Sequence, residues 1–167
     1  FVRDARINMI YEGTNTVQSL DLLGRKVLGN QGATLRKFGK EVAAFIESEG
    51  VNEKMAEFIN PLALIAGQME KFTTEIGFRG FQNADEVGAA AVPYLRVAGH
   101  LVFAYMFARM AQVALRAIAE GNTDPFYQGK LQTARFYFAR LFPETLTLMK
   151  TARAGSRVLL DTDAALA

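Results

Sequence analysis

The most constraining feature of the sequence is the regular spacing of apolar residues over positions 53–79. They recur at steps of three and four, which places them on one face of an α-helix, whereas a half-buried strand would alternate at every second residue. The members of this stripe are Met55, Phe58, Ile59, Leu62, Ile65, Ala66, Met69, Phe72, Thr73 and Ile76. Because such a stripe must be buried against other elements, it predicts a helix within a multi-helix fold.

Three further long helices are predicted, over residues 33–49, 84–120 and 125–158. Turns that contain glycine separate them, and the Asp-Pro pair at positions 124–125 is a strong helix start. Four long helices with short connections predict an all-α fold, an up-down-up-down four-helix bundle preceded by a helix-turn-helix segment.

Prolines and a glycine predict the details of these helices. Pro61 should bend or split the second helix, and Pro143 should kink the fourth. Pro93 marks either an early bend or the true start of the third helix. That helix is apolar on most sides and so should have neighbours on more than one side. Gly99 should let another helix come close to it.

Composition narrows the classes of function. Half of the 167 residues are hydrophobic, so disorder is not expected, and the net charge of +2 comes from scattered rather than clustered basic residues, which argues against nucleic-acid binding. The chain has no cysteine and hence no thiolate metal site. Charged or polar residues interrupt the apolar stretch 92–115, so no membrane span is predicted. No secretory signal is visible, and we expect a cytoplasmic protein.

His100 is the only histidine in the sequence. It lacks the acidic neighbour that a Glu-x-x-His di-iron pair needs, so no metal site is predicted. We expect His100 to lie between helices and to make one hydrogen bond.

Aromatic residues gather in the fourth helix, at Phe126, Tyr127, Phe136, Tyr137, Phe138 and Phe142. Core packing or an interface is the favoured interpretation, and a groove for an acyl chain or CoA is the alternative. Arg135 and Arg140 could approach CoA phosphates, although a solvated face is the favoured interpretation for both.

The first thirty residues carry most of the functional information. Residues 3–11 have helical spacing, Gly13 interrupts it, and helical spacing resumes at Val17, which predicts helix, tight turn, helix. Glu12 falls at the end of the first helix, where the helix dipole disfavours a carboxylate, beside Ile10 and Tyr11, which form an apolar wall. Such a carboxylate can have a raised proton affinity and act as a base. On spacing alone, an ordinary corner with an exposed glutamate is the favoured interpretation.

Residues 3–27, RDARINMIYEGTNTVQSLDLLGRKV, resemble the C-terminal signature of the acyl-CoA dehydrogenase family. The matching parts are the RDARI lead-in, the IYEGTN turn, Val17-Gln18 in place of the common Ile-Gln, and the Gly24-Arg25-Lys26 close. The match is specific because it is long and its internal spacing is fixed.

The resemblance implies roles for five residues. In the family, the glutamate of YEGT removes the α-proton of an acyl-CoA thioester while the β-hydride passes to the flavin, which gives Glu12 the role of catalytic base. Gly13 and Arg25 match positions near the substrate, and Thr14 and Thr16 match positions that lie against FAD. The implied partners are an acyl-CoA substrate and an electron-transfer flavoprotein, with a homo-oligomeric assembly.

Residues 33–158 resemble the extra helical domain, acetyl-CoA dehydrogenase-like, at the C-terminus of larger bacterial members of the family. We therefore predict two parts, residues 1–30 with the catalytic glutamate and residues 31–167 as an accessory bundle. The chain starts inside a motif, so we expect a C-terminal fragment of a longer enzyme that lacks dehydrogenase activity alone. A helical module for interaction or dimerisation is the alternative, and a free-standing ligand-binding bundle is the least favoured.

Overall fold

The computed structural model describes residues 2–10 and 13–161, and this part of the chain is helical, without a strand. The elements are α1 (Val2–Ala5), η1 (Arg6–Met9), α2 (Asn15–Leu20), η2 (Asp21–Leu28), α3 (Ala33–Glu49), η3 (Glu53–Met55), α4 (Ala56–Gln82), α5 (Asp85–Ala119), α6 (Pro125–Phe136), η4 (Tyr137–Leu141), α7 (Glu144–Arg153) and α8 (Arg157–Leu160). Of the short elements labelled η, η1 and η3 are 3₁₀ turns, and η2 and η4 are π-helical stretches that continue α2 and α6.

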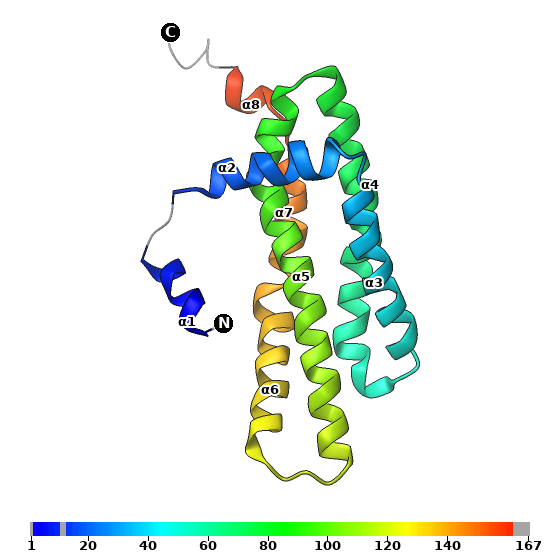
Figure 1. The fold of residues 1–167 in the computed structure, drawn as a ribbon. Coiled ribbons are helices and arrows are strands. Elements are labelled where there is room, and N and C mark those ends of the chain that lie inside the picture. The colour runs from blue at the N-terminus through cyan, green and yellow to red at the C-terminus, as the bar shows by residue number, and fades with distance from the viewer. Residues whose placement is uncertain (1, 11–12, 162–167) are drawn as a thin grey trace.

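Helices α3, α4 and α5 run alternately down and up, and α6 followed by α7 forms the fourth rod of the bundle (Figure 1). The predicted all-helical bundle is confirmed. The expectation that residues 125–158 form one kinked helix is wrong in detail, because the rod is interrupted by the π-helical η4 and a turn before α7. Pro143 explains the interruption, since it has no N–H to donate and its ring clashes with the preceding turn of a helix.

The other two prolines leave their helices unbroken. Pro61 lies inside α4 and Pro93 inside α5, so Pro61 does not split its helix and the third helix starts well before Pro93. Pro61 falls within the second turn of α4, where only one hydrogen bond near the helix end is lost.

Helix α5 is the centre of the bundle. It packs against α2, α4, α6 and α7, which confirms the prediction of neighbours on several sides. Small side chains dominate its buried positions, which are Ala90, Ala91, Tyr94, Val97, Leu101, Ala104, Ala108, Ala111 and Ala114. Gly99 does not supply the predicted close approach, because a Cβ there would meet no atom within 4 Å. Alanines allow the neighbouring helices to come close instead.

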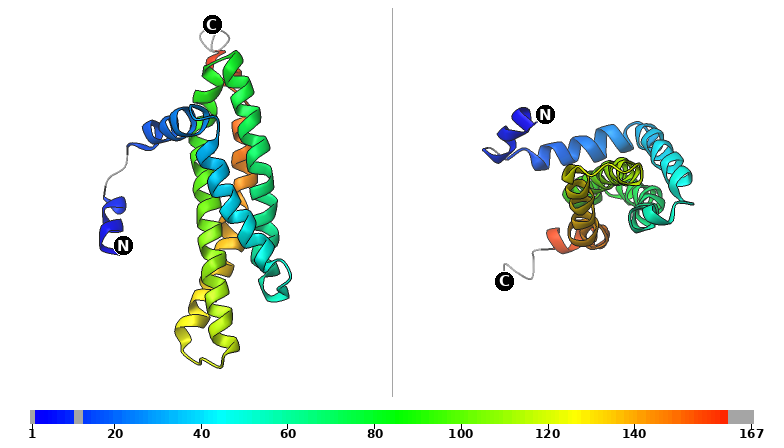
Figure 2. Two further views of the ribbon diagram at one scale, coloured as in Figure 1. Left: turned by 45° about the vertical axis from the view of Figure 1, so that its right-hand side comes forward. Right: turned by 90° about the horizontal axis from the view of Figure 1, so that it is seen from below.

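The helix formed by α2 and η2 crosses the bundle near one end (Figures 1 and 2). Leu23 and Val27 are buried in the bundle core and anchor it. The helix runs through Leu28, and a turn over residues 29–32 connects it to α3. Two glycines close the turn that follows. A Cβ on Gly29 would lie 2.6 Å from the carbonyl oxygen of Arg25, and Gly32 has a φ of 75°.

The predicted helix-turn-helix segment is present, with different bounds. The first helical piece comprises α1 and η1 and ends at Met9, and the second begins at Asn15 rather than at Val17. α1 lies away from the four rods in both views (Figures 1 and 2). The division of the chain into two parts at residues 30 and 31 stays a prediction.

Helix α5 is long and apolar enough to cross a membrane by length and composition. The central helix of a soluble bundle has the same properties, and α5 is packed among the other rods. The finding therefore does not show a membrane span, and the predicted absence of one stays a prediction.

A polar pair lies inside the core between α4 and α5. The hydroxyl of Thr73 is 2.7 Å from the carbonyl oxygen of Met69 and 2.8 Å from the hydroxyl of Tyr94. Thr73 has one hydroxyl proton, which it donates to the carbonyl, so Tyr94 donates to Thr73. Burial raises the pKa of Tyr94 to about 12, and the phenol stays neutral.

We expect Thr73→Val to lower the free energy of unfolding by about 1–3 kcal/mol, because it leaves the buried hydroxyl of Tyr94 without an acceptor. The double variant with Tyr94→Phe should recover most of this loss, since both polar partners are then removed. Urea denaturation of the four proteins measures the coupling. Equal losses in the single and double variants would contradict a stabilising hydrogen bond between the two hydroxyls.

Candidate functional site

Three of the five predicted site residues lie together at the start of α2. Glu12, the predicted catalytic base, lies outside the described residues. Gly13, Thr14 and Thr16 follow it and are exposed. Gly13 has a φ of 131°, a value that residues with a Cβ rarely adopt, so the sequence needs glycine at this position. A Cβ there would meet no atom within 4 Å, so the restriction comes from the backbone and not from crowding.

The inner part of the same helix fixes the direction in which these residues project. Ser19 is buried and its hydroxyl donates to the carbonyl oxygen of Thr16 at 2.8 Å. Leu23 and Val27 then anchor the following turns in the core. Thr14 stands at the N-cap of α2 without a side-chain capping bond, so its hydroxyl is not used within the helix. The first turn of α2 therefore presents free hydroxyl groups to the solvent.

Arg25 lies further along the same helix. Nine residues separate it from Thr16, roughly 14 Å at the rise of an α-helix. Its Nε is 2.5 Å from Oδ1 of Asp21, whose Oδ2 is 2.9 Å from Nζ of Lys26. Both contacts hold the pKa of Asp21 below its usual value, and the hydrogen bond from Lys26 has the larger effect. The structure thus places Arg25 on the same helix as the threonines, at a distance from them, with its side chain 76% exposed.

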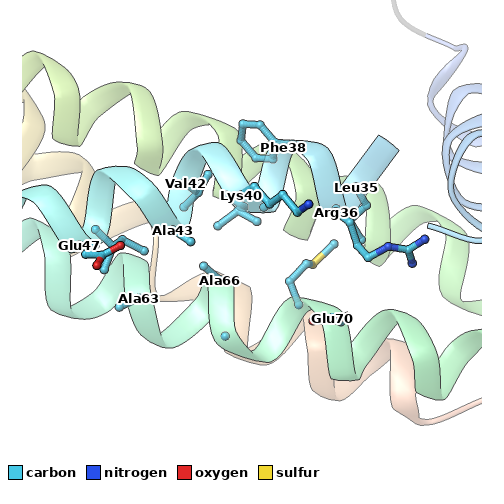
Figure 3. Close-up of a pocket in the computed structure, with 15 residues that line it drawn as sticks. Leu35, Arg36, Phe38, Lys40, Val42, Ala43, Glu47, Ala63, Ala66 and Glu70 are labelled. Atoms are coloured by element: carbon cyan, nitrogen blue, oxygen red, sulfur yellow. The ribbon is translucent and has the colours of Figure 1, made fainter. Parts of the chain in front are cut away.

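A groove between α3 and α4 was not predicted from the sequence. It has a volume of about 550 Å³ and is largely apolar. Small residues face one another across it and leave it open, as Figure 3 shows for Ala43 on α3 and for Ala63 and Ala66 on α4. Of the predicted site residues that the structure describes, which are Gly13, Thr14, Thr16 and Arg25, none lines this groove. Only the alternation of small residues on two neighbouring helices signals it in the sequence.

His100 joins α5 to the fourth rod. Its Nδ1 is 2.8 Å from the hydroxyl of Tyr137 and its Nε2 is 3.3 Å from Oε2 of Glu144. The predicted interhelical position is confirmed, with two side-chain partners rather than one. Burial raises the pKa of Tyr137 above its ordinary value. In the part of the chain that the structure describes, no cluster of three His, Asp or Glu side chains could hold a metal ion.

The aromatic cluster of the fourth rod divides between core and surface. Tyr137, Phe138 and Phe142 are buried, which confirms core packing for them, whereas Phe126 and Phe136 are exposed. The guanidinium group of Arg135 forms a two-pronged ion pair with Glu57, with N–O distances of 2.8 and 2.9 Å. Arg135 and Arg140 are both exposed, which confirms the predicted solvated face, and the ion pair ties Arg135 to α4.

The comparisons with known proteins agree with this fold. The family described as "Acetyl-CoA dehydrogenase C-terminal like" matches residues 38–163. The chain belongs to this family. Residues that form the four rods, from within α3 to beyond α8, make up the matched region.

Three curated relatives are acyl-CoA dehydrogenases by name. The chain is 32% identical to 3-methylmercaptopropionyl-CoA dehydrogenase of Ruegeria pomeroyi and 27% identical to the broad-specificity linear acyl-CoA dehydrogenase FadE5 of Mycobacterium tuberculosis, in each case over 86% of this chain and 25% of the relative. It is 26% identical to a butyryl-CoA dehydrogenase of Syntrophomonas wolfei, over 95% of this chain and 27% of the relative. The chain thus spans about a quarter of the length of these relatives.

The open groove gives a test of packing. We expect Gly67→Ala to raise the free energy of unfolding by about 0.5–1 kcal/mol, because Gly67 lies inside α4 and an added Cβ would meet no atom within 4 Å. Gly80→Ala is the matched control in the same helix, since its Cβ would lie 2.4 Å from Cγ2 of Val87. Thermal or urea unfolding should show a gain for the first variant and none for the second. Equal effects would contradict the described packing.

Proposed function

We propose that this chain is the C-terminal part of an FAD-dependent acyl-CoA dehydrogenase, which carries out α,β-dehydrogenation of an acyl-CoA thioester. Membership of the family and the names of the relatives support the proposal. One observation extends the support for this proposal to the first thirty residues of the chain. An alignment over 95% of the chain leaves out about eight of its 167 residues, so the match to butyryl-CoA dehydrogenase spans positions 12 to 16.

The proposed base is Glu12. The α-proton of a thioester is weakly acidic, so the carboxylate has to be held close to it and the developing enolate has to be stabilised. The backbone N–H of Glu12 is proposed to donate to the thioester oxygen. Gly13 supports this assignment, because its φ of 131° and the absence of a side chain leave room for the substrate beside the base. Arg25, largely exposed on the same helix, is proposed to contact the substrate.

The residues of this chain fit one edge of an FAD site. The exposed hydroxyls of Thr14 and Thr16 can donate and accept hydrogen bonds, as the polar rim of a flavin requires. The α3–α4 groove does not include them, so most of the contact with FAD has to come from other parts of the proposed enzyme. FAD, when bound, would accept the β-hydride of the substrate, and an electron-transfer flavoprotein is the proposed acceptor of its electrons.

A role as an interaction module is the second candidate, and it is compatible with the first. Apolar Ile7, Ile10, Val17 and Leu20 in the segment around the proposed base are exposed. Exposed apolar residues gathered in one segment are typical of a surface that another protein part covers. We propose that the site is completed only when this segment is covered, whether in the same polypeptide or in a homo-oligomer, and that the chain alone lacks activity.

We expect Glu12→Gln to abolish dehydrogenation in the full-length holoenzyme, because an amide cannot accept the α-proton. Exchange of the substrate α-proton with deuterated solvent should stop as well, which tests the base apart from hydride transfer. Glu41→Gln, an exposed glutamate of α3, is the control and should keep full activity. Unchanged turnover or exchange in the Glu12 variant would overturn the role given to this residue.

Arg25→Ala should raise KM for the acyl-CoA about tenfold or more, because hydrogen bonds to charged groups contribute roughly 1.5–3 kcal/mol. The free energy of unfolding should change by less than about 0.5 kcal/mol, since the side chain is exposed. Lys26→Ala is the matched control, because Lys26 is the other partner of Asp21. If both variants raise KM equally, the effect belongs to Asp21 and not to substrate contact by Arg25.

A further inference from the structure

Helix α5 carries a second apolar surface besides the one buried in the bundle. Val102, Phe103, Met106 and Val113, which we name the outer stripe, are 40%, 58%, 52% and 59% exposed. Their spacing places them on neighbouring lines of one helix face. The stripe therefore forms an exposed, largely apolar strip on the outside of the central helix.

The outer stripe is unusual for the surface of a soluble bundle. The most apolar 18-residue window of α5 is only 28% buried within the described structure. Soluble monomers seldom leave large contiguous apolar patches uncovered, and those they expose are commonly binding surfaces. The outer stripe thus has the character of a binding surface, and nothing in the described structure covers it.

The same face of α5 is covered at its other end. Ala91, Val102 and Val113 are eleven residues apart, which is about three helical turns, so they share one face. Ala91 is 1% exposed. The α2–η2 helix packs against α5 near the N-terminal end of α5 (Figure 1). The helix that carries the outer stripe is therefore also the helix against which the segment with the candidate site is packed.

We propose that the outer stripe is the surface on which the FAD- and acyl-CoA-binding remainder of the enzyme docks. This inference rests on the proposed function. The remainder has to reach Thr14 and Thr16 to complete the site, and these residues belong to the helix that packs against α5. Val17 and Leu20 of the same helix are exposed apolar residues as well. One partner can thus cover both regions together.

Arg109 defines the chemistry of the partner more closely. It lies three residues after Met106 and four before Val113, so it interrupts the outer stripe. Arg109 is exposed, and its guanidinium group is 5.6 Å from the centre of the Tyr105 ring. An isolated cation is costly inside a lipid bilayer, whereas a protein surface can supply an acidic group or carbonyl oxygens to it. The surface that docks here is therefore an apolar protein surface with an acceptor opposite Arg109.

Hydroxyl-radical labelling, read residue by residue by mass spectrometry, tests the proposal on the holoenzyme and on this chain alone. In the chain alone, Phe103, Met106 and Val113 should be labelled; in the holoenzyme their labelling should fall to the level of the buried Met149. Exposed Val51 and Phe81 are internal controls that should be labelled in both. Equal labelling of the outer stripe in both proteins would overturn the proposal.

Two other outcomes would also overturn it. Loss of labelling in the chain alone that grows with its concentration would assign the outer stripe to a second copy. Loss that needs added phosphatidylglycerol vesicles would assign it to a lipid surface.

A direct check is the Met106→Lys variant, which should restore labelling of Phe103 and Val113 in the holoenzyme. The matched control is Leu64→Lys, at an exposed position of α4, which should not restore it. Protection that persists in Met106→Lys would contradict docking at the stripe.

The labelling result is independent of the catalytic assignment. Glu12→Gln holoenzyme should keep the outer stripe protected, because this variant changes the base and not the docking surface. Activity that survives Glu12→Gln would overturn the proposed catalytic role alone. An unprotected outer stripe in an enzyme that loses activity with Glu12→Gln would overturn the docking proposal alone.

Discussion

Close packing around α5 is the constraint on which the rest of the structure depends. Its buried face is made largely of alanines, among them Ala104, Ala108 and Ala111, so neighbouring helices can approach the backbone closely. One helix can thereby contact α2, α4, α6 and α7. Interiors are packed like crystals, and a larger side chain at any of these positions would push several helices apart at once.

The position of the candidate site follows from the same packing. The helix that carries Gly13, Thr14 and Thr16 is held on the bundle by Leu23 and Val27 and is turned into α3 by a glycine-dependent turn. Its first turn projects from the core and carries apolar residues that face the solvent. The bundle therefore acts as a support that presents the segment, and in the proposed enzyme a further surface closes over it.

Much of the fold could be predicted from local signals. The stripe of α4 and the start of the fourth rod depend on spacing and capping, and Asp124 indeed accepts a hydrogen bond from the N–H of Phe126 at 2.9 Å. The minor role of Gly99 depends on which helix lies opposite, which spacing does not reveal. The α3–α4 groove was missed for the same reason. The roles of Glu12, Thr14, Thr16 and Arg25 came from family resemblance, since spacing alone does not distinguish a catalytic turn from an ordinary corner.

The central claim is that Glu12 serves as the α-proton base of an acyl-CoA dehydrogenase. A structure of the full-length holoenzyme with a non-reactive acyl-CoA analogue tests it most directly, through the distance from the Glu12 carboxylate to the carbon in the α position. The account predicts a separation of about 3–3.5 Å, the range of a reactive approach. A Glu12 carboxylate turned away from the analogue, with another acid beside the α-carbon, would contradict it.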